Sequence, residues 1–338
     1  MRIQNKIKNQ KMRTIKQYIV ECLRINEGGK AVNGTPMTQP QLKEVYQDVI
    51  KKILEPKLGL TEEGVDYAPL GTFGKKKADQ TSGDLDIAIS IERIAGYLGI
   101  SVDMVGQAVQ DILAEEGVDF VFNPGTLVTS FAWPIPGTDK FGQVDFMPSD
   151  NMDYSKWMYH SPDFTKAESN YKGVFRNQLL MAIVHYAKED IISKNDKDEV
   201  LEFERYSYRV ATGVFNTRRS YLSNSRKNPD GTPKRNTTAT RVKEYDKLVT
   251  NVPEEIIKIA FGDGVKRSQV MRFEDVYELV MSDNFIHKNK LNDIIKKYIQ
   301  ELIKNEVEIP MIIMEDWPEF CEELQTKHAN RKRRVKKD

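Results

Sequence analysis

The chain has 338 residues, 51 Lys and Arg against 50 Asp and Glu, and 39% hydrophobic residues. At roughly 150 residues per domain this length predicts about two domains. The 14 Phe, 14 Tyr and 3 Trp argue against a wholly disordered chain. No apolar run approaches the roughly 18 to 20 residues of a membrane helix, and the basic residues 1–17 lack the apolar core of a signal peptide. We therefore expect a soluble cytoplasmic protein with no membrane partner.

The net charge of +1 conceals an uneven distribution of the basic residues. They gather in three segments, at 2–16, 218–243 and 327–337. Such segments attract polyanions by releasing counterions. The alternative for each of them is charge that is merely solvated.

The N-terminal part of the sequence predicts two helices. Apolar residues recur at helical spacing in 11–24 and again in 39–54. Glycines between the two patterns indicate a loop. Pro56 is predicted to end the second helix, because proline has no N–H for the helical ladder. Residues 1–58 are therefore expected to form N-terminal helices that pack on the core.

An α+β block follows, in which most segments alternate apolar and polar residues. The alternation ends near Pro148, so we place this block at residues 59–150. It is expected to form one mixed or antiparallel sheet flanked by helices. The predicted strands are 65–70, 85–91, 119–122, 126–135 and 142–147, and the predicted helix is 102–115.

The rest of the chain is expected to form a mainly helical second domain, at 151–326. Strand-like residues interrupt its helices and are read as a hairpin at 201–222. A polar, basic stretch at 223–240 is expected to be an exposed loop, and 327–338 a basic disordered tail. The predicted helices are 170–187, 253–261, 273–281 and 291–303.

The segment 70–89 carries the strongest chemical signal. Gly71 and Thr72 end an apolar strand, a polar loop covers 73–83, and Asp84 and Asp86 open the next strand. Strand residues i and i+2 point the same way, so two carboxylates share one face. Carboxylates so close repel, and either a proton at raised pKa or a divalent cation must offset the repulsion. Hard oxygen ligands favour Mg²⁺ or Mn²⁺ over zinc.

Asp145 supplies a third carboxylate. It lies on a short strand between Val144 and Phe146, where a half-buried strand would otherwise favour an apolar or neutral residue. If this strand pairs beside the strand of Asp84 and Asp86, all three acids converge. Three carboxylates around two metal ions about 3.5 to 4 Å apart are what in-line nucleotidyl transfer requires.

Together these motifs resemble the DNA polymerase β-like nucleotidyltransferase superfamily. The resemblance covers roughly residues 65 to 150 and implies that 59–150 is the catalytic domain. It implies that Gly71 and Thr72 form the turn that holds the triphosphate. By the same resemblance, Asp84 and Asp86 are ligands to both metal ions, and Asp145 is a ligand and the base facing the acceptor hydroxyl.

Within the superfamily, Asp145 followed by Pro148 looks closest to one branch. That branch contains the archaeal CCA-adding enzymes, the oligoadenylate synthases and the bacterial cyclic-oligonucleotide synthases. The sequence departs from these relatives at Thr72, where Ser is commoner, and at lysines 75–77, where an Arg-Gly pair is common.

Other residues are candidates for nucleotide contacts, each with a plainer alternative. Lys75 either touches triphosphate or a nucleic-acid backbone, or belongs to a solvated loop. Lys172 and Arg176 begin the helix after the sheet, from which the resemblance implies base or phosphate contacts; the alternative is an ordinary helix surface. Asp79 is expected to face solvent rather than to act as a fourth ligand.

The expected function is therefore metal-dependent transfer of NMP from an NTP, such as ATP, to a hydroxyl with release of pyrophosphate. Two Mg²⁺ or Mn²⁺ ions are the expected cofactors. The acceptor is an RNA 3′ end or a nucleotide, the latter in making linear or cyclic oligonucleotides; a protein hydroxyl stays open. The alternative is a non-catalytic protein that keeps the fold, in a nucleoprotein or viral assembly.

Overall fold

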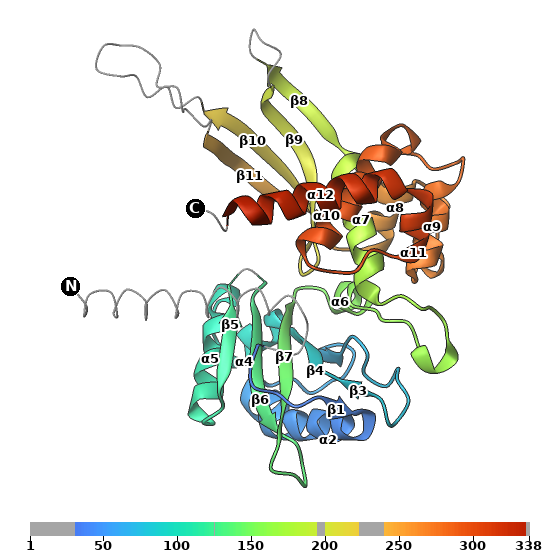
Figure 1. Ribbon diagram of the computed structural model, residues 1–338. Helices are drawn as coiled ribbons and strands as arrows, with labels where there is room; N and C mark the ends of the chain where they lie inside the picture. The colour runs from blue at the N-terminus through green and yellow to red at the C-terminus, as the bar shows by residue number, and fades with distance from the viewer. Residues whose placement is uncertain (1–30, 125, 195–199, 223–239, 336–338) are drawn as a thin grey trace, which may run out of the picture. The chain divides into compact units, whose positions relative to one another are not determined.

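A computed structural model describes residues 31–124, 126–194, 200–222 and 240–335, and we treat the chain as two compact units, Met1–Asn170 and Tyr171–Asp338 (Figure 1). The helix predicted at 11–24 and nearly all of the loop predicted at 223–240 lie outside the described residues. Among the residues described, no helix is both long and apolar enough to span a bilayer.

The first unit begins with a long, three-part helical segment. Thr38 caps α2 (Gln39–Val49) in a capping box with Gln41, and the helix continues through a π-helical stretch, Ile50–Leu54, into α3 (Glu55–Leu58). The prediction that Pro56 ends the helix is wrong. Pro56 lies in the first turn of α3, where a missing N–H is tolerated, and Gly59 in the left-handed conformation ends the helix instead.

A five-stranded mixed sheet forms the centre of this unit. Its order is β2-β4-β7-β6-β5, in which β4 and β7 are parallel and the other neighbours are antiparallel. The expected α+β class with a mixed sheet flanked by helices is thus confirmed. The strands are β2 (Tyr67–Pro69), β4 (Asp84–Ser90), β5 (Phe120–Asn123), β6 (Val128–Pro134) and β7 (Phe141–Ser149).

Strand alternation divides the sheet into an apolar face and an acidic face. Leu85 and Ile87 of β4 and Val144 and Phe146 of β7 are buried in one core with apolar residues of α2. Their strand neighbours must point to the other face. The apolar core therefore fixes which way the acidic residues point.

Smaller elements complete the first unit. A two-stranded sheet pairs β1 (Met37–Thr38) with β3 (Thr81–Ser82). The sequence did not predict α4 (Ile91–Leu98), which begins directly after β4 at the capping residue Ser90. The remaining helices are α5 (Val105–Glu115) and α6 (Met152–Met158), with short 3₁₀ turns at Val102–Met104 and Phe164–Lys166.

The second unit combines helices with a four-stranded antiparallel sheet of order β11-β10-β9-β8. The hairpin expected at 201–222 is confirmed as β9 (Val200–Arg209) and β10 (Gly213–Leu222). Two further strands were not predicted, β8 (Glu189–Lys194) and β11 (Thr240–Thr250). The helices are α7 (Gly173–Ala187), α8 (Pro253–Phe261), α9 (Phe273–Met281), α10 (Leu291–Lys304), α11 (Met311–Asp316) and α12 (Pro318–Val335). The last of these runs through 327–335, where the sequence predicts a disordered tail.

His185 makes the second unit sensitive to acid. Its Nε2 lies 3.3 Å from Nη1 of Arg205, and because the guanidinium can only donate, this nitrogen accepts and the ring is neutral. Burial, Arg205 and Lys297 lower the pKa of His185 to about 4, against an opposing effect of Glu301. In the unfolded chain the same group has a pKa near 6.5.

We predict that the contribution of neutral His185 to the free energy of unfolding is fully present above pH 6.5 and is lost as the pH falls from 6.5 towards 4. Below pH 6.5 His185 binds a proton in the unfolded chain but not in the folded state. Urea unfolding of the wild type and of His185→Gln should show the wild type losing about 1 to 2 kcal/mol relative to the variant between pH 7 and pH 5. Parallel pH curves for the two proteins would contradict the prediction.

Candidate active site

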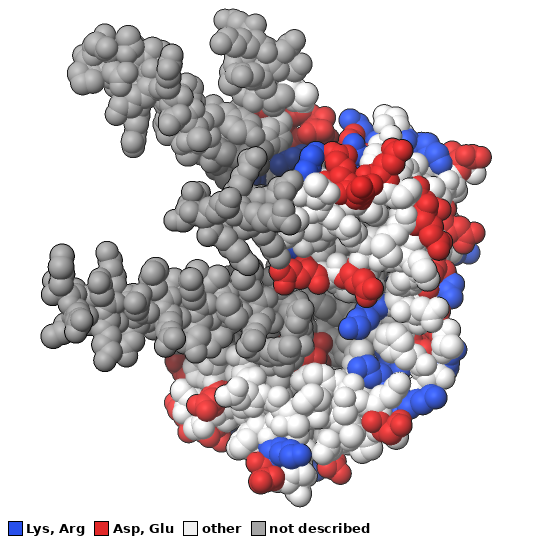
Figure 2. Space-filling model, in the orientation of Figure 1, with Lys and Arg blue, Asp and Glu red and all other residues white. Residues whose placement is uncertain are grey.

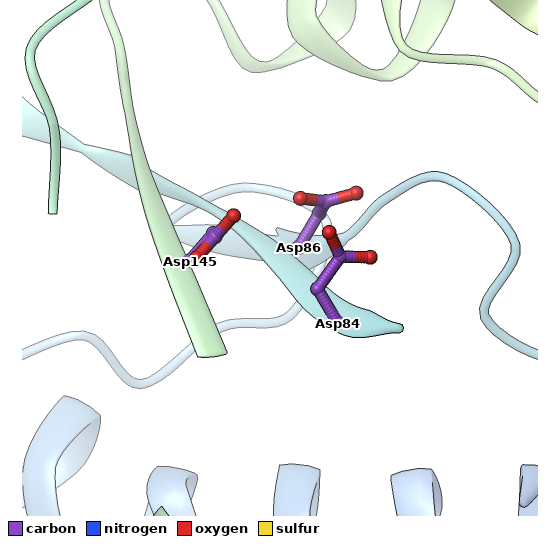
Figure 3. Close-up of side chains that lie close together, drawn as sticks. All are labelled: Asp84, Asp86 and Asp145. Carbon is purple, nitrogen blue, oxygen red and sulfur yellow. The ribbon is translucent and has the colours of Figure 1, made fainter. Parts of the chain in front are cut away.

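The structure brings together the three acids that the sequence singles out. Asp86 of β4 stands directly opposite Asp145 of β7, and Asp84 lies two residues before Asp86. Each contributes a carboxylate oxygen, and these oxygens lie within 4.8 Å of one another. Figure 3 shows the three side chains on the same side of the two strands. Such a group can hold a metal ion, as the sequence predicts.

Burial and mutual repulsion disfavour negative charge in this cluster. The pKa of Asp86 is raised well above its usual value, first by burial and then by the charges of Asp84 and Asp145. Burial and Asp84 raise the pKa of Asp145 to about 7, although hydrogen bonds from Ser130 and Gln143 oppose this shift. Protons or a divalent cation would relieve the repulsion, so the site fits a cation.

The turn after β2 approaches the cluster so closely that it needs glycine. Gly71 has φ +60°, and a Cβ there would lie 2.8 Å from Oδ2 of Asp86. The N–H of Leu70 donates to the backbone oxygen of Asp86 at 2.9 Å, which anchors the turn on β4. The predicted phosphate-holding turn and the acids are thus neighbours.

Thr72 belongs to a polar network at the base of the loop 73–83. Its Oγ1 lies 2.7 Å from Oγ of Ser82, which closes the loop. Gln39 of α2 joins this network from below, because its Nε2 donates to Ser82 Oγ at 3.3 Å and its Oε1 accepts from the N–H of Gly74 at 2.8 Å. Gln39 and Ser82 are buried. Through Gln39, α2 therefore holds both ends of the loop 73–83.

The side chains of two loop lysines contact protein backbone. Nζ of Lys75 donates to the carbonyl oxygen of Ser161 at 2.6 Å and lies 3.4 Å from Nδ1 of His160. Nζ of Lys76 donates to the carbonyl oxygen of Thr81 at 2.8 Å. Lys75 thus ties the loop to the chain after α6, and its contact with a nucleotide stays a prediction. Asp79 is exposed.

Lys172 and Arg176 belong to the second unit. Lys172 is exposed at the N-cap of α7, whereas Arg176 is fully buried. Arg176 donates to Oδ1 of Asn177 at 3.2 Å and to the carbonyl oxygen of Met271 at 3.4 Å. An ordinary helix surface therefore describes Lys172 but not Arg176. Their proposed nucleotide contacts stay predictions.

Gln143 is a residue of the site that was not predicted from the sequence. It is 1% exposed, and its Nε2 donates to both carboxylate oxygens of Asp145. The signal was present in the spacing, because residues 143 and 145 of one strand share a face.

Acidic and basic side chains are interspersed on the coloured surface in Figure 2. The described part of the internal basic segment also contains paired charges. Arg218 forms an ion pair with Glu202 at 2.6 Å, and Arg209, on the neighbouring strand, pairs with Asp246. The basic residues described in this sheet are thus partly neutralised within it.

Neither a known protein family nor a curated protein matches the chain. Among solved structures, the chain is similar to Leishmania infantum polymerase beta, whose crystal structure is that of a ternary P/T complex. The TM-score is 0.34 and the sequence identity is 10%, over 70% of this chain and 77% of the polymerase.

Proposed function

We propose that the protein is a metal-dependent nucleotidyltransferase of the polymerase β-like kind. The observation that carries this proposal is the convergence of Asp84, Asp86 and Asp145 from two parallel neighbouring strands, beside a turn in which a Cβ at Gly71 would lie 2.8 Å from Asp86 Oδ2. A purely structural sheet gains nothing from three half-buried, mutually repelling carboxylates. A site that binds cations and phosphate explains both the acids and the turn.

The three acids would have different roles because they lie on two different strands. Asp84 and Asp86 lie on one strand and would hold two Mg²⁺ or Mn²⁺ ions together, with Asp145 as a further ligand. Bound ions of this kind would supply Lewis-acid stabilisation of the charge on the phosphates. Asp145 lies on the neighbouring strand, so its carboxylate would accept the proton of the attacking hydroxyl while the other two acids face the triphosphate.

The turn and loop would bind the nucleotide. Gly71 allows the backbone to come close to phosphate, and Thr72 offers a hydroxyl donor. Lys75 would exchange its carbonyl partner at Ser161 for triphosphate. We propose Lys172 and Arg176 as further contacts to base or phosphate, as the resemblance implies.

A polyanionic or nucleotide acceptor suits the sequence best. Six Lys and Arg lie within residues 2–16 and seven within 327–337, and such segments attract nucleic acid. We propose an RNA 3′ end or a nucleotide as the acceptor, the latter in the synthesis of linear or cyclic oligonucleotides. We propose that the chain belongs to the same branch of the superfamily as the CCA-adding enzymes, the oligoadenylate synthases and the cyclic-oligonucleotide synthases.

The decisive experiment incubates the protein with each labelled NTP and Mg²⁺ or Mn²⁺, first alone and then with RNA, and separates the products by chromatography. We expect labelled product and pyrophosphate with a divalent cation and neither with EDTA. Product without RNA indicates oligonucleotide synthesis, whereas product that needs RNA indicates tailing.

A thermal shift with NTP and cation should accompany activity. No product and no thermal shift would favour the non-catalytic alternative.

A further inference from the structure

The buried amide of Gln143 lies between the carboxylate cluster and the first described residues of the chain. On one side its Oε1 accepts from the N–H of Ala31 at 2.9 Å and of Val32 at 3.3 Å. On the other side its Nε2 lies 2.9 Å from Oδ1 and 3.2 Å from Oδ2 of Asp145. One side chain therefore touches both a candidate metal ligand and a segment more than 100 residues away.

The orientation of this amide is fixed by its partners. A backbone N–H can only donate, so Ala31 and Val32 require the amide oxygen to face them. The NH₂ group must then face Asp145, and because it contacts both oxygens it helps to orient that carboxylate, together with the hydrogen bond from Ser130. Loss of the N–H partners would remove the reason for the amide to stay in this orientation.

Residues 31–35 also pack closely on the start of β7. A Cβ at Gly34 would lie 2.8 Å from the backbone nitrogen of Gln143 and 3.0 Å from its Cβ. The N–H of Thr35 donates to the carbonyl oxygen of Phe141 at 2.7 Å. The segment thus packs on β7 through the side chain of Gln143 and through the backbone of Phe141 and Gln143.

We propose that Gln143 is a positioning residue for Asp145, and that it makes cation binding at the carboxylate cluster depend on the docking of residues 31–35. The inference rests on the proposed function, which requires the cluster to bind a cation. Residues that orient a ligand from behind typically change metal affinity 10- to 100-fold when they are replaced. Residues 31–35 would in this way control the cation affinity of a carboxylate cluster that is far from them in sequence.

The test measures Mn²⁺ binding directly, by electron paramagnetic resonance titration of the full chain without substrate. Gln143→Leu should weaken Mn²⁺ binding about 10-fold or more. Gly34→Ala keeps Gln143 but forces the segment away from it, and should weaken binding in the same direction. Asn33→Ala, at an exposed position of the same segment, should bind as the wild type does.

Amide hydrogen exchange provides a second readout that a merely structural role would not move. Mn²⁺ should slow exchange at Ala31 and Val32 in the wild type, and this slowing should be lost in Gly34→Ala. Circular dichroism confirms that each variant is folded; if Gln143→Leu does not fold, Gly34→Ala decides.

The outcomes separate the two proposals. Failure of the wild type to bind Mn²⁺ would overturn the proposed function and this inference with it. If the wild type binds Mn²⁺ and Asp86→Asn does not, but the folded Gln143→Leu and Gly34→Ala proteins match the wild type, this inference alone is wrong.

Discussion

Replacement of Asp86 by Asn should reduce nucleotide transfer by about 1000-fold or more while making the metal-free protein more stable. Asn keeps the size of the side chain but removes one of the charges that bind cations. A loss of about 4 kcal/mol of transition-state stabilisation corresponds to this factor. Stability should rise because burial, Asp84 and Asp145 all disfavour the ionised carboxylate, and Asn removes that penalty.

The sign of the pH effect follows from the raised pKa of Asp86. The penalty is largest where the folded-state carboxylate is ionised, shrinks as the pH falls and the folded state takes up a proton, and vanishes below the ordinary aspartate pKa of about 3.9. Thermal unfolding in EDTA should therefore show the larger advantage of Asp86→Asn at pH 8 and a smaller one at pH 5.5. Asp79→Asn, which changes an exposed acid of the loop 73–83 before β4, should leave activity and stability near those of the wild type. Retained transfer by Asp86→Asn would remove the catalytic assignment.

Gly71→Ala should lower activity by about 100-fold, a loss typical of displacing a catalytic group by about 1 Å. The new Cβ would lie 2.8 Å from Oδ2 of Asp86, so either the carboxylate or the turn must move. The positive φ adds a cost of about 1 to 2 kcal/mol to folding. Steady-state kinetics and Mn²⁺ titration should both record the change.

Gly74→Ala is the matched control for this substitution. Gly74 has φ +70°, close to that of Gly71, but a Cβ there meets nothing within 4 Å. Both variants therefore carry the same backbone strain, and only Gly71→Ala disturbs Asp86. Equal losses of activity in the two proteins would show that strain, and not contact with the carboxylate, is responsible.

The sequence predicted the acidic part of the site well because alternation carries that information. Apolar residues at every second position of β4 and β7 specify which face is buried, so the orientation of Asp84, Asp86 and Asp145 follows from the strands alone. The pairing of β4 with β7 does not follow from alternation, since strand order depends on contacts between distant segments. The structure supplies it.

The missed features depend on context that local patterns do not contain. β8 and β11 are rich in charged residues and lack clean alternation, so only their pairing in the sheet makes them strands. α4 was hidden because the apolar run of β4 continues into Ile91, past the capping residue Ser90. Pro56 was misread because proline ends a helix only where its N–H is needed. Gln143 is an unremarkable amide until Ala31 and Asp145 are placed beside it.

The direct pairing of Asp86 with Asp145 makes the site sensitive to the length of β7. A single residue inserted into β7 before Asp145 would turn that aspartate into the apolar core and bring an apolar neighbour to the acidic face. Two inserted residues would restore the direction of the side chain but would move Asp145 about 6.6 Å along the strand, away from Asp86. The site therefore depends on the register of β4 against β7 as well as on the face that each strand buries.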